Sequence, residues 1–397
     1  MEERTCIGII AEFDPFHRGH AHLIAQAKAA LPGAPVVCAM SGPFTQRGEA
    51  AIVSKYARAE MALRCGADLV VELPVQWAVS SAESFARGGV QILHALGVTH
   101  LAFGSESGDL TALQIVAQAL DSAAFPDALR PYLQQGLPFA SARQKALETL
   151  VEAETAEHLT RPNNLLGIEY LRAIQTLAPE MRALTVPRVG AAHNAAGVRR
   201  GFASASQLRQ WLLAGELERA CAQMPEPAAE IAKRQELASL EYNARGILTL
   251  LRRMTPEDWR ALPDCGEGLE HRLCRAAAES TTLERFWDTV KSKRYAHARI
   301  RRLTLWAYLG LTRQTQWAAG VPYVRVLGLG QDGKAVLKQA KGLERLPVLT
   351  KPAQVKRWDV RCQEQFAIDA RAELLWGMCL PEVGRAQNEW KMGPVVV

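Results

Sequence analysis

The chain has 397 residues, of which 48% are hydrophobic and 22% are charged, and its formal net charge is +6 at pH 7. This length predicts two or three domains with packed cores, and the composition excludes a chain dominated by disorder. The positive charge suits a polyanionic partner better than a negative charge would, but it equally suits a mildly basic cytosolic enzyme.

The cysteines and the first residues bear on the compartment. Eight cysteines occur, none of them in a CxxC pair, and Cys6 and Cys38 lie inside apolar runs. These features predict buried free thiols, a reducing compartment and no zinc site. The start of the chain is too polar for a signal peptide, and no run approaches the roughly 20 apolar residues of a membrane span. We therefore expect a cytoplasmic protein.

The first hundred residues alternate between strand and helix patterns. Strands are expected at 5–11, 34–40, 68–73 and 99–103, and helices at 19–31, 54–65 and 81–96. Continuous apolar strands separated by helices predict a Rossmann-like, parallel α/β sheet that is covered on both faces. Gly66 and Gly97 are placed to end two of these helices.

The later part of the chain has a mainly helical pattern. Helices are expected from about 110 to 177, a strand near 182–186 and a helix start at 204–214. Beyond these lie a late strand candidate at 323–329 and a helix within 353–378. We predict a nucleotide-binding α/β domain over residues 1–215 and a mainly helical, basic domain over residues 216–397.

The most informative segment is GIIAEFDPFHRGH at residues 8–20, in which a strand leads through a turn into a helix. Ligands of open parallel sheets bind at the carboxyl ends of strands, and the free N–H groups of the following helix favour an anion. His17 and His20 can face one side of a helical turn, where both rings would donate to phosphate oxygens. Gly19 leaves room for the nucleotide, and Pro15 stiffens the turn.

Such a site suits attack on an α-phosphate. This reaction needs placement of the reactants and stabilisation of phosphoryl charge, not a covalent enzyme intermediate. Two histidines at this spacing can also bind a metal or be surface and capping residues. No nearby cluster completes a metal ligand set, and the order of proline, glycine and paired histidines favours phosphate binding.

Residues 17–20 (HRGH) resemble the HxGH motif of the nucleotidylyltransferase superfamily, which has a Rossmann-like fold and cleaves ATP between the α- and β-phosphates. A second signature of that superfamily, an ISSTxxR-like stretch, is similar to ASASQLR at 203–209, which has alanines at the first and third positions. The resemblance implies hydroxyl contacts from Ser204 and Ser206 and a bidentate phosphate contact from Arg209. The alternative is a serine N-cap followed by a solvated arginine.

Five further stretches narrow the resemblance: SGPFTQRGE (41–49), DLVVELP (68–74), FGSE (103–106), PNNLLGIEY (162–170) and SKRYAHARIRR (292–302). With the two ATP motifs they resemble the bacterial tRNA(Met) cytidine acetate ligase family, from the start of the chain to at least Leu329. Phe13 and Asp14 are conservative departures. The family forms acetyl-adenylate from acetate and ATP and transfers the acetyl group to N4 of the wobble cytidine (position 34) of elongator tRNA(Met), giving N4-acetylcytidine.

The resemblance also implies roles for individual residues. It implies catalysis by His17 and His20, and Mg²⁺ as the companion of ATP without an assigned protein ligand. Asn163 and Asn164 follow a proline and precede a helix, so we expect one of them to be the helix N-cap, and the resemblance places the other against ATP. The implied ATP contacts are Ile7, Gly8, Ile9, Ile10, Ala11, Glu12, Phe13, Asp14, Pro15, Phe16, His17, Arg18, Gly19, His20, Gly104, Asn163, Asn164 and Arg188. The loop 41–49 is expected at the same edge, where Gln46 and Arg47 are candidates to meet acetate or the target base.

A basic stretch, KSKRYAHARIRR at 291–302, carries six lysines and arginines and no acid. On a helix these cations would form a positive ridge for tRNA phosphates, with Tyr295 available to stack on a base. The candidate tRNA contacts are Lys291, Lys293, Arg294, Arg299, Arg301 and Arg302, and Arg199 and Arg200 could extend the surface. The alternative is a solvated amphipathic helix, since Ile300 and Leu303 would face a core.

Two other functions stay open at this point. A small-molecule nucleotidylyltransferase (pyrophosphorylase) of coenzyme biosynthesis would share the ATP motifs, but such enzymes are usually shorter and need no basic helical domain. A non-catalytic RNA-binding protein could keep the same fold, but binding alone would not require both histidines. The residues themselves identify neither acetate as the acid nor the group that deprotonates N4, and the oligomeric state is likewise open.

Overall fold

The computed structural model describes residues 5–188, 202–266, 268–315, 320–383 and 389–397. Its centre is a twisted sheet with the strand order β5-β4-β1-β2-β3-β6-β7, and β8 pairs with β6. Strands β1 to β5 pair with one another in parallel, whereas β6 runs antiparallel to β3. The strand bounds are Ile7–Ala11 (β1), Val36–Ser41 (β2), Leu69–Leu73 (β3), His100–Ser105 (β4), Arg182–Pro187 (β5), Val324–Leu329 (β6), Val348–Leu349 (β7) and Val395–Val396 (β8).

The central parallel strands β1, β2 and β3 are buried on both faces, as their continuous apolar sequences predict, whereas the edge strand β5 is mostly half-buried or exposed. On β1, Ile7 and Ile9 face one core, while Ile10 and the preceding residue Cys6 face the other. The first core lies under α1 (Arg18–Ala30), α2 (Lys55–Arg64), α10 (Ala205–Leu213), α11 (Leu217–Cys221) and α12 (Glu226–Ala232). The second lies under α4 (Ala82–Ala95), α5 (Leu110–Leu120), α9 (Pro162–Leu177) and α18 (Gln331–Leu343). The predicted α/β sheet covered on both faces is therefore confirmed.

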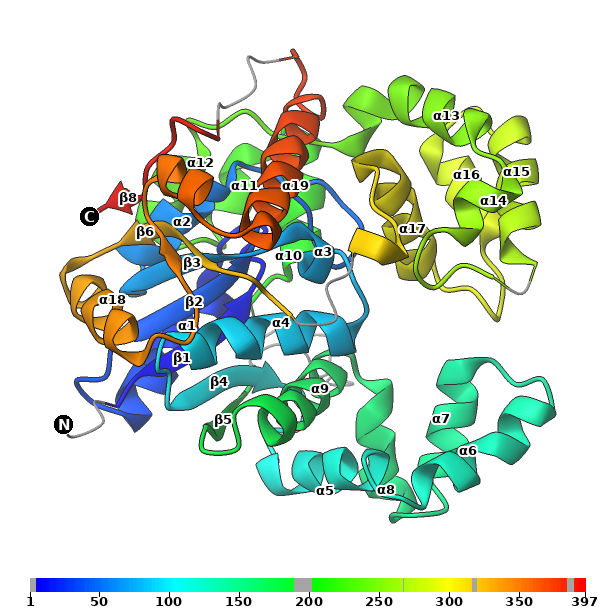
Figure 1. Ribbon diagram of the computed structural model, residues 1–397, viewed down its shortest axis with the longest axis horizontal. Helices are drawn as coiled ribbons and strands as arrows, with labels where there is room; N and C mark the ends of the chain where they lie inside the picture. The colour runs from blue at the N-terminus through cyan, green and yellow to red at the C-terminus, as the bar shows by residue number, and fades with distance from the viewer. Residues whose placement is uncertain (1–4, 189–201, 267, 316–319, 384–388) are drawn as a thin grey trace.

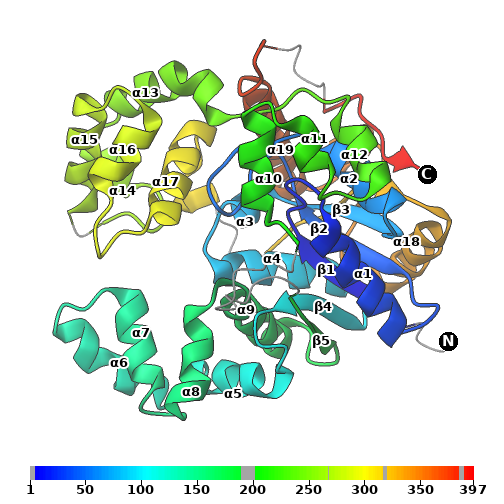
Figure 2. The ribbon, with the colours of Figure 1, turned by 180° about the vertical axis from the view of Figure 1, so that it is seen from behind.

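Two groups of helices extend from the sheet toward the same side of the molecule (Figures 1 and 2). One contains α6 (Phe125–Gln134), α7 (Phe139–Leu147) and α8 (Ala153–Glu157). The other has its own apolar core and contains α13 (Ala244–Arg253), α14 (Pro256–Arg260), α15 (Leu269–Glu279), α16 (Leu283–Val290) and α17 (His297–Leu309). The short α3 (Val75–Ala78) and the long α19 (Val360–Gly377) connect that core to the sheet.

The late strand expected at 323–329 is present as β6, and it adds to the sheet of the N-terminal half. The division into two domains at residue 215 remains a prediction. It did not anticipate that β6, from the C-terminal half of the chain, would pair with β3. Gly66 and Gly97 follow α2 and α4 with positive φ, as the sequence pattern predicts. All eight cysteines are free thiols, most of them buried. Among the described helices, none is both long and apolar enough to span a membrane.

Candidate functional site

A cavity of about 770 Å³ opens at the carboxyl ends of β1, β2, β4 and β5. This is the edge at which an open parallel sheet binds its ligands. Seventeen of the residues that the sequence singled out line the cavity, which shows that they come together in space. They are Ile9, Ile10, Ala11, Glu12, Phe13, Asp14, His17, His20, Gln46, Arg47, Gly104, Asn163, Arg188, Ser204, Ser206, Arg209 and Arg302.

The other predicted residues do not line this cavity, and their surroundings explain why. Ile7 and Phe16 are fully buried in the core, and a Cβ on Gly8 would collide with Leu93 and Val98. A Cβ on Gly19 would lie 2.8 Å from the His17 ring, so this glycine makes room for the histidine. The remaining residues outside the lining are Pro15, Arg18, Asn164, Lys291, Lys293, Arg294, Arg299 and Arg301.

His17 and His20 stack on each other at the start of α1, with ring centroids 3.8 Å apart. His17 is the N-cap residue, and its Nδ1 accepts the backbone N–H of Gly19 at 3.0 Å. The Nδ1 of His20 accepts the backbone N–H of His17 at 3.2 Å, which completes a capping box built from two imidazoles. Each ring therefore uses its acceptor nitrogen locally and carries its proton on Nε2.

Burial keeps both histidines neutral. It lowers the pKa of His17 to about 4, with a smaller effect from the nearby Arg188 cation. Burial also lowers the pKa of His20 well below its usual value, and His17 and Arg188 add to this effect. Two neutral rings with Nε2–H groups at a helix N-terminus are donors suited to anionic oxygens.

The side of the cavity formed by β4 and α9 resolves the choice between the two asparagines. The N-cap of α9 is Arg161, so the expectation that Asn163 or Asn164 is the N-cap is wrong. Asn164 is fully buried and its Oδ1 accepts the backbone N–H groups of Glu106 and Ser107. Asn163 lines the cavity, where its Oδ1 accepts Arg188 Nη1 at 3.0 Å. Asn163, not Asn164, is therefore placed to meet a ligand.

The loop 41–50 connects the HxGH turn to α10. Glu49 Oε2 lies 3.0 Å from Arg209 Nε, and Asp14 Oδ2 lies 2.6 Å from Arg209 Nη1. The guanidinium of Arg209 is thus occupied by two carboxylates, and the predicted bidentate fork for phosphate is not free in this structure. Ser204 caps α10 by accepting the N–H of Gln207, as the alternative interpretation held. Ser206 accepts Arg47 Nη1 at 2.6 Å.

The basic stretch does not form the predicted ridge. Helix α17 begins at His297, so Lys291, Lys293 and Arg294 precede it, although all three are exposed. Tyr295 is buried and cannot offer its ring to a base. The reason is that Ile300 and its apolar neighbours turn one face of the helix into the core that also holds Tyr295.

The arginines of α17 bind the protein itself. Arg299 donates to the Asp264 carbonyl, Arg301 Nη1 lies 2.7 Å from Glu49 Oε1, and Arg302 donates to the Gln46 carbonyl. Arg301 and Arg302 thus hold the loop 41–50. Arg199 and Arg200 lie outside the described residues.

Three cavity arginines are available for an anion. Arg47, Arg188 and Arg302 line the cavity, and within the described chain none of them pairs with a carboxylate within 4 Å. Glu12 lines the same cavity and accepts the Gln46 N–H at 2.6 Å. Burial raises the pKa of Glu12 to about 7, and the neighbouring Asp14 carboxylate adds to the shift. The site therefore combines positive charge with one carboxyl that titrates near neutral pH.

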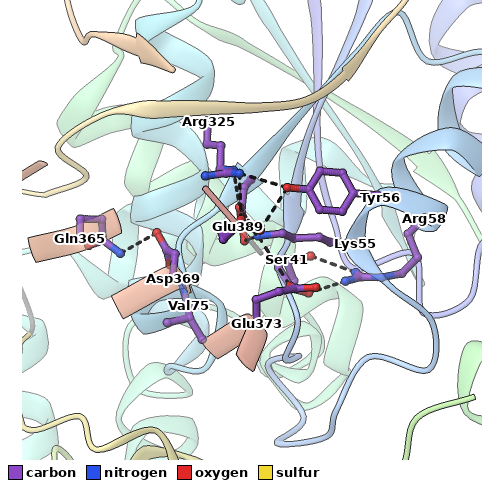
Figure 3. Close-up of polar contacts among 12 residues, drawn as sticks. Ser41, Lys55, Tyr56, Arg58, Val75, Arg325, Gln365, Asp369, Glu373 and Glu389 are labelled. Carbon is purple, nitrogen blue, oxygen red and sulfur yellow. Dashed lines mark hydrogen bonds and ion pairs between the residues drawn. The ribbon is translucent and has the colours of Figure 1, made fainter. Parts of the chain in front are cut away.

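A buried network of charges lies behind the cavity wall (Figure 3). The guanidinium of Arg58 is fully buried and donates to the carbonyls of Glu12, Ser41, Gly42 and Val53. These carbonyls belong to the ends of β1 and β2 and to the loop that follows, so Arg58 fixes the backbone of the cavity wall.

The same network ties distant parts of the chain together. Lys55 Nζ lies 2.9 Å from both oxygens of Glu72, 3.7 Å from Glu373 and in contact with Glu389. Arg325 on β6 also contacts Glu72 and Glu389.

Sequence reasoning missed several lining residues. Phe139 and Arg143 of α7 line the cavity together with Leu120, Phe125 and Glu169. No motif marks Phe139 and Arg143, and only their spacing of four residues could have suggested that they share a helix face. No group of three or more His, Cys, Asp or Glu side chains in the described chain has the geometry to hold a metal ion.

Comparisons with known proteins agree with this geometry. The family model described as HIGH Nucleotidyl Transferase matches residues 4–390. Relatives named tRNA(Met) cytidine acetate ligase include one from Kosmotoga olearia (35% identical, covering 89% of this chain and 87% of that protein). Another is from Alkaliphilus metalliredigens (35% identical, 96% of each). The crystal structure of Thermotoga maritima TmcAL bound with alpha-thio ATP is 30% identical, covers 99% of each chain and has a TM-score of 0.92.

Proposed function

Because this chain belongs to the tRNA(Met) cytidine acetate ligase family, within the HIGH nucleotidyl transferases, we propose that it acetylates N4 of cytidine 34 in elongator tRNA(Met) with acetate and ATP. The observation that carries the proposal is the pair of neutral histidines at the start of α1, in one cavity with Arg47, Arg188 and Arg302. These groups suit a triphosphate, and the cavity has room for a second substrate.

The first step forms acetyl-adenylate. A carboxylate oxygen of acetate attacks the α-phosphorus, the bond from that phosphorus to the bridging oxygen breaks, and pyrophosphate leaves with the bonding electrons. The Nε2–H groups of His17 and His20 stabilise the charge that develops on the phosphoryl oxygens. Because both Nδ1 atoms are held by backbone N–H groups, the donors are oriented before the substrate arrives.

The second step transfers the acetyl group. The N4 amine attacks the acetyl carbonyl carbon, the carbon–oxygen bond to AMP breaks, and N4 gives up one proton. Glu12 is the candidate acceptor for that proton, because its carboxyl lines the cavity and its pKa of about 7 is matched to neutral solution. Asp14 and Glu49 favour its protonated form, whereas Arg47 and the Gln46 N–H favour the ionised form.

Magnesium accompanies ATP in this proposal, held by phosphate oxygens and water instead of a protein cage. This fits the described residues, which offer no cluster of metal-ligating side chains. Bound Mg²⁺ would neutralise phosphate charge, and the chain's own residues position the reactants. We also propose a cytoplasmic location, supported by the eight free thiols, which suit a reducing compartment.

The test is to incubate the protein with ATP, Mg²⁺, isotopically labelled acetate and unmodified elongator tRNA(Met), and to analyse the nucleosides by mass spectrometry. We expect labelled N4-acetylcytidine, which is lost with His20→Ala. Labelled acetyl-adenylate without labelled RNA would refute the tRNA acceptor. Absence of both products would refute the acetate ligase and favour a nucleotidylyltransferase with another small substrate.

A further inference from the structure

The cavity has a second, apolar half that the ATP motifs do not explain. Its wall is formed by side chains from α4, α5, α6, α7 and α9. They include Phe85, Leu120, Phe125, Phe139 and Leu166. Of these, Phe85, Leu120 and Phe125 are buried, whereas Phe139 is 61% exposed. Phe139 is the one large apolar side chain of the described residues that is both strongly exposed and part of the cavity lining.

Helix α7 presents a second functional group beside Phe139. Arg143 lies four residues later, so both side chains occupy one face of the helix, and both line the cavity. Arg143 Nη2 lies 2.7 Å from Glu169 Oε1, while Glu169 Oε2 lies 2.7 Å from Arg172. Glu169 is only 3% exposed, so Arg143 is held by a buried carboxylate. Within the described chain, its Nε and Nη1 have no hydrogen-bond partner.

We propose that Phe139 and Arg143 form the subsite for the acceptor nucleobase, a conclusion that rests on the proposed function. An exposed aromatic ring next to an arginine is the combination that proteins use to bind unstacked bases of single-stranded RNA. Helix α7 belongs to a helical group that extends away from the sheet, where a large substrate can reach it (Figures 1 and 2).

The chemistry of the arginine selects cytosine over adenine. Arginine is a donor only. Cytosine offers two adjacent acceptors, O2 and N3, so an arginine can hold this edge and leave N4 free for the acetyl group. On its Watson–Crick edge, adenine offers a single acceptor, N1, beside its own amino donor. Gly104 and Arg188, which the resemblance assigns to ATP together with Asn163, lie at the carboxyl ends of β4 and β5.

The experiment separates the two half-reactions. Acetate-dependent exchange of pyrophosphate into ATP reports adenylate formation without tRNA, and labelled acetate in tRNA reports transfer. Phe139→Ala is expected to lower kcat/KM for tRNA about 5- to 100-fold, the range for loss of one base stack, and to leave exchange unchanged. Phe139→Trp should restore transfer. Arg143→Lys keeps a charge beside Glu169 but loses the fork, and it should also lower transfer alone.

Two variants serve as matched controls. Leu133→Ala changes an exposed apolar residue of α6 that does not line the cavity, and Arg130→Gln changes an exposed arginine of the same helix. Both should leave exchange and transfer unchanged. Equal loss of exchange and transfer in Phe139→Ala would assign the subsite to the adenylate and overturn the inference, as would undiminished transfer. A wild-type protein without acetate-dependent exchange would refute the proposed function itself.

Discussion

Replacement of Lys55 by methionine tests whether the buried charge network holds the fold together. The Lys55 side chain is fully buried, and its ammonium contacts carboxylates from three parts of the chain: Glu72 of β3, Glu373 of α19 and Glu389 near the C-terminus. Lys55→Met keeps an unbranched chain of similar length but removes the cation. Glu373 has no hydrogen-bond partner among the described residues, so it would lose its one ion pair there and keep only the weaker effect of the Arg58 charge.

The magnitude follows from the number of charges left behind. Removing one partner of a buried ion pair costs about 3–5 kcal/mol, because the remaining charge stays desolvated. Arg325 still contacts Glu72 at 3.5 Å and Glu389 at 2.9 Å in the variant, which offsets part of the loss. We therefore expect the free energy of unfolding to fall by about 3 kcal/mol at pH 8, the lower end of that range.

The assay is equilibrium unfolding in urea at pH 8 and at pH 5. Burial raises the pKa of Glu373 to about 7 even with the Lys55 ammonium beside it, and Lys55 helps to hold the pKa of Glu389 below its usual value. Loss of the ammonium should therefore raise both pKa values further. The folded variant then binds more protons than the unfolded chain, so its stability increases as the pH falls toward the ordinary glutamate pKa of 4.5. The free energy of unfolding of Lys55→Met should accordingly fall short of the wild-type value by less at pH 5 than at pH 8.

The control is Lys28→Met, which removes a cation that is 39% exposed and lies 3.1 Å from Asp68. A surface pair of this kind contributes about 0–1 kcal/mol. The argument would be refuted if Lys55→Met lost no more free energy of unfolding than Lys28→Met, or if its loss did not change with pH.

Three further predictions concern the site. His20→Asn should lower kcat of acetate-dependent pyrophosphate exchange about 10²- to 10³-fold, as for loss of one oxyanion donor; an unchanged kcat would remove His20 from catalysis. The wild-type rate of acetyl transfer should rise with pH through about 7 as Glu12 ionises. Glu12→Gln should abolish this rise in the pH–rate profile and slow transfer about 10²-fold or more. A rise that persists in Glu12→Gln would exclude Glu12 as the base. Gly48 has φ +80°, and a Cβ there would lie 2.5 Å from Cβ of Arg301, whereas Gly33 has φ +77° and open space around it. Gly48→Ala should therefore lower the melting temperature and raise KM for ATP more than Gly33→Ala does. Equal effects of the two substitutions would contradict this packing argument.

The sequence predicted the sheet and the location of the site well, because both depend on local patterns. Apolar runs of strand length mark β1 to β5, and the order of strand, turn and helix places residues 8–20 at the carboxyl edge. Residues at the ends of other parallel strands, such as Gly104 and Arg188, must then meet the same cavity. The neutral state of the histidines is a different matter, because it depends on burial by the rest of the molecule.

The partners of charged side chains could not be predicted. Arg209 meets Asp14, which is 195 residues away, and Arg301 meets Glu49, which is 252 residues away. A basic residue in an isolated helix pattern looks the same whether it faces RNA or a carboxylate of its own protein. The pattern at 291–302 therefore predicts a tRNA surface, although Arg299, Arg301 and Arg302 bind other parts of the chain.

The loop 41–50 explains why those intramolecular contacts bear on function. Glu49 bridges Arg209 on α10 and Arg301 on α17 with its two oxygens. At Gly48 the loop lies directly against the backbone of α17, and Gln46 and Arg47 on the same loop line the cavity. A shift of α17 must therefore move this loop, because Gly48 leaves no space between them. The basic helix can thus influence the reaction without touching tRNA, by determining where the loop stands relative to the HxGH turn.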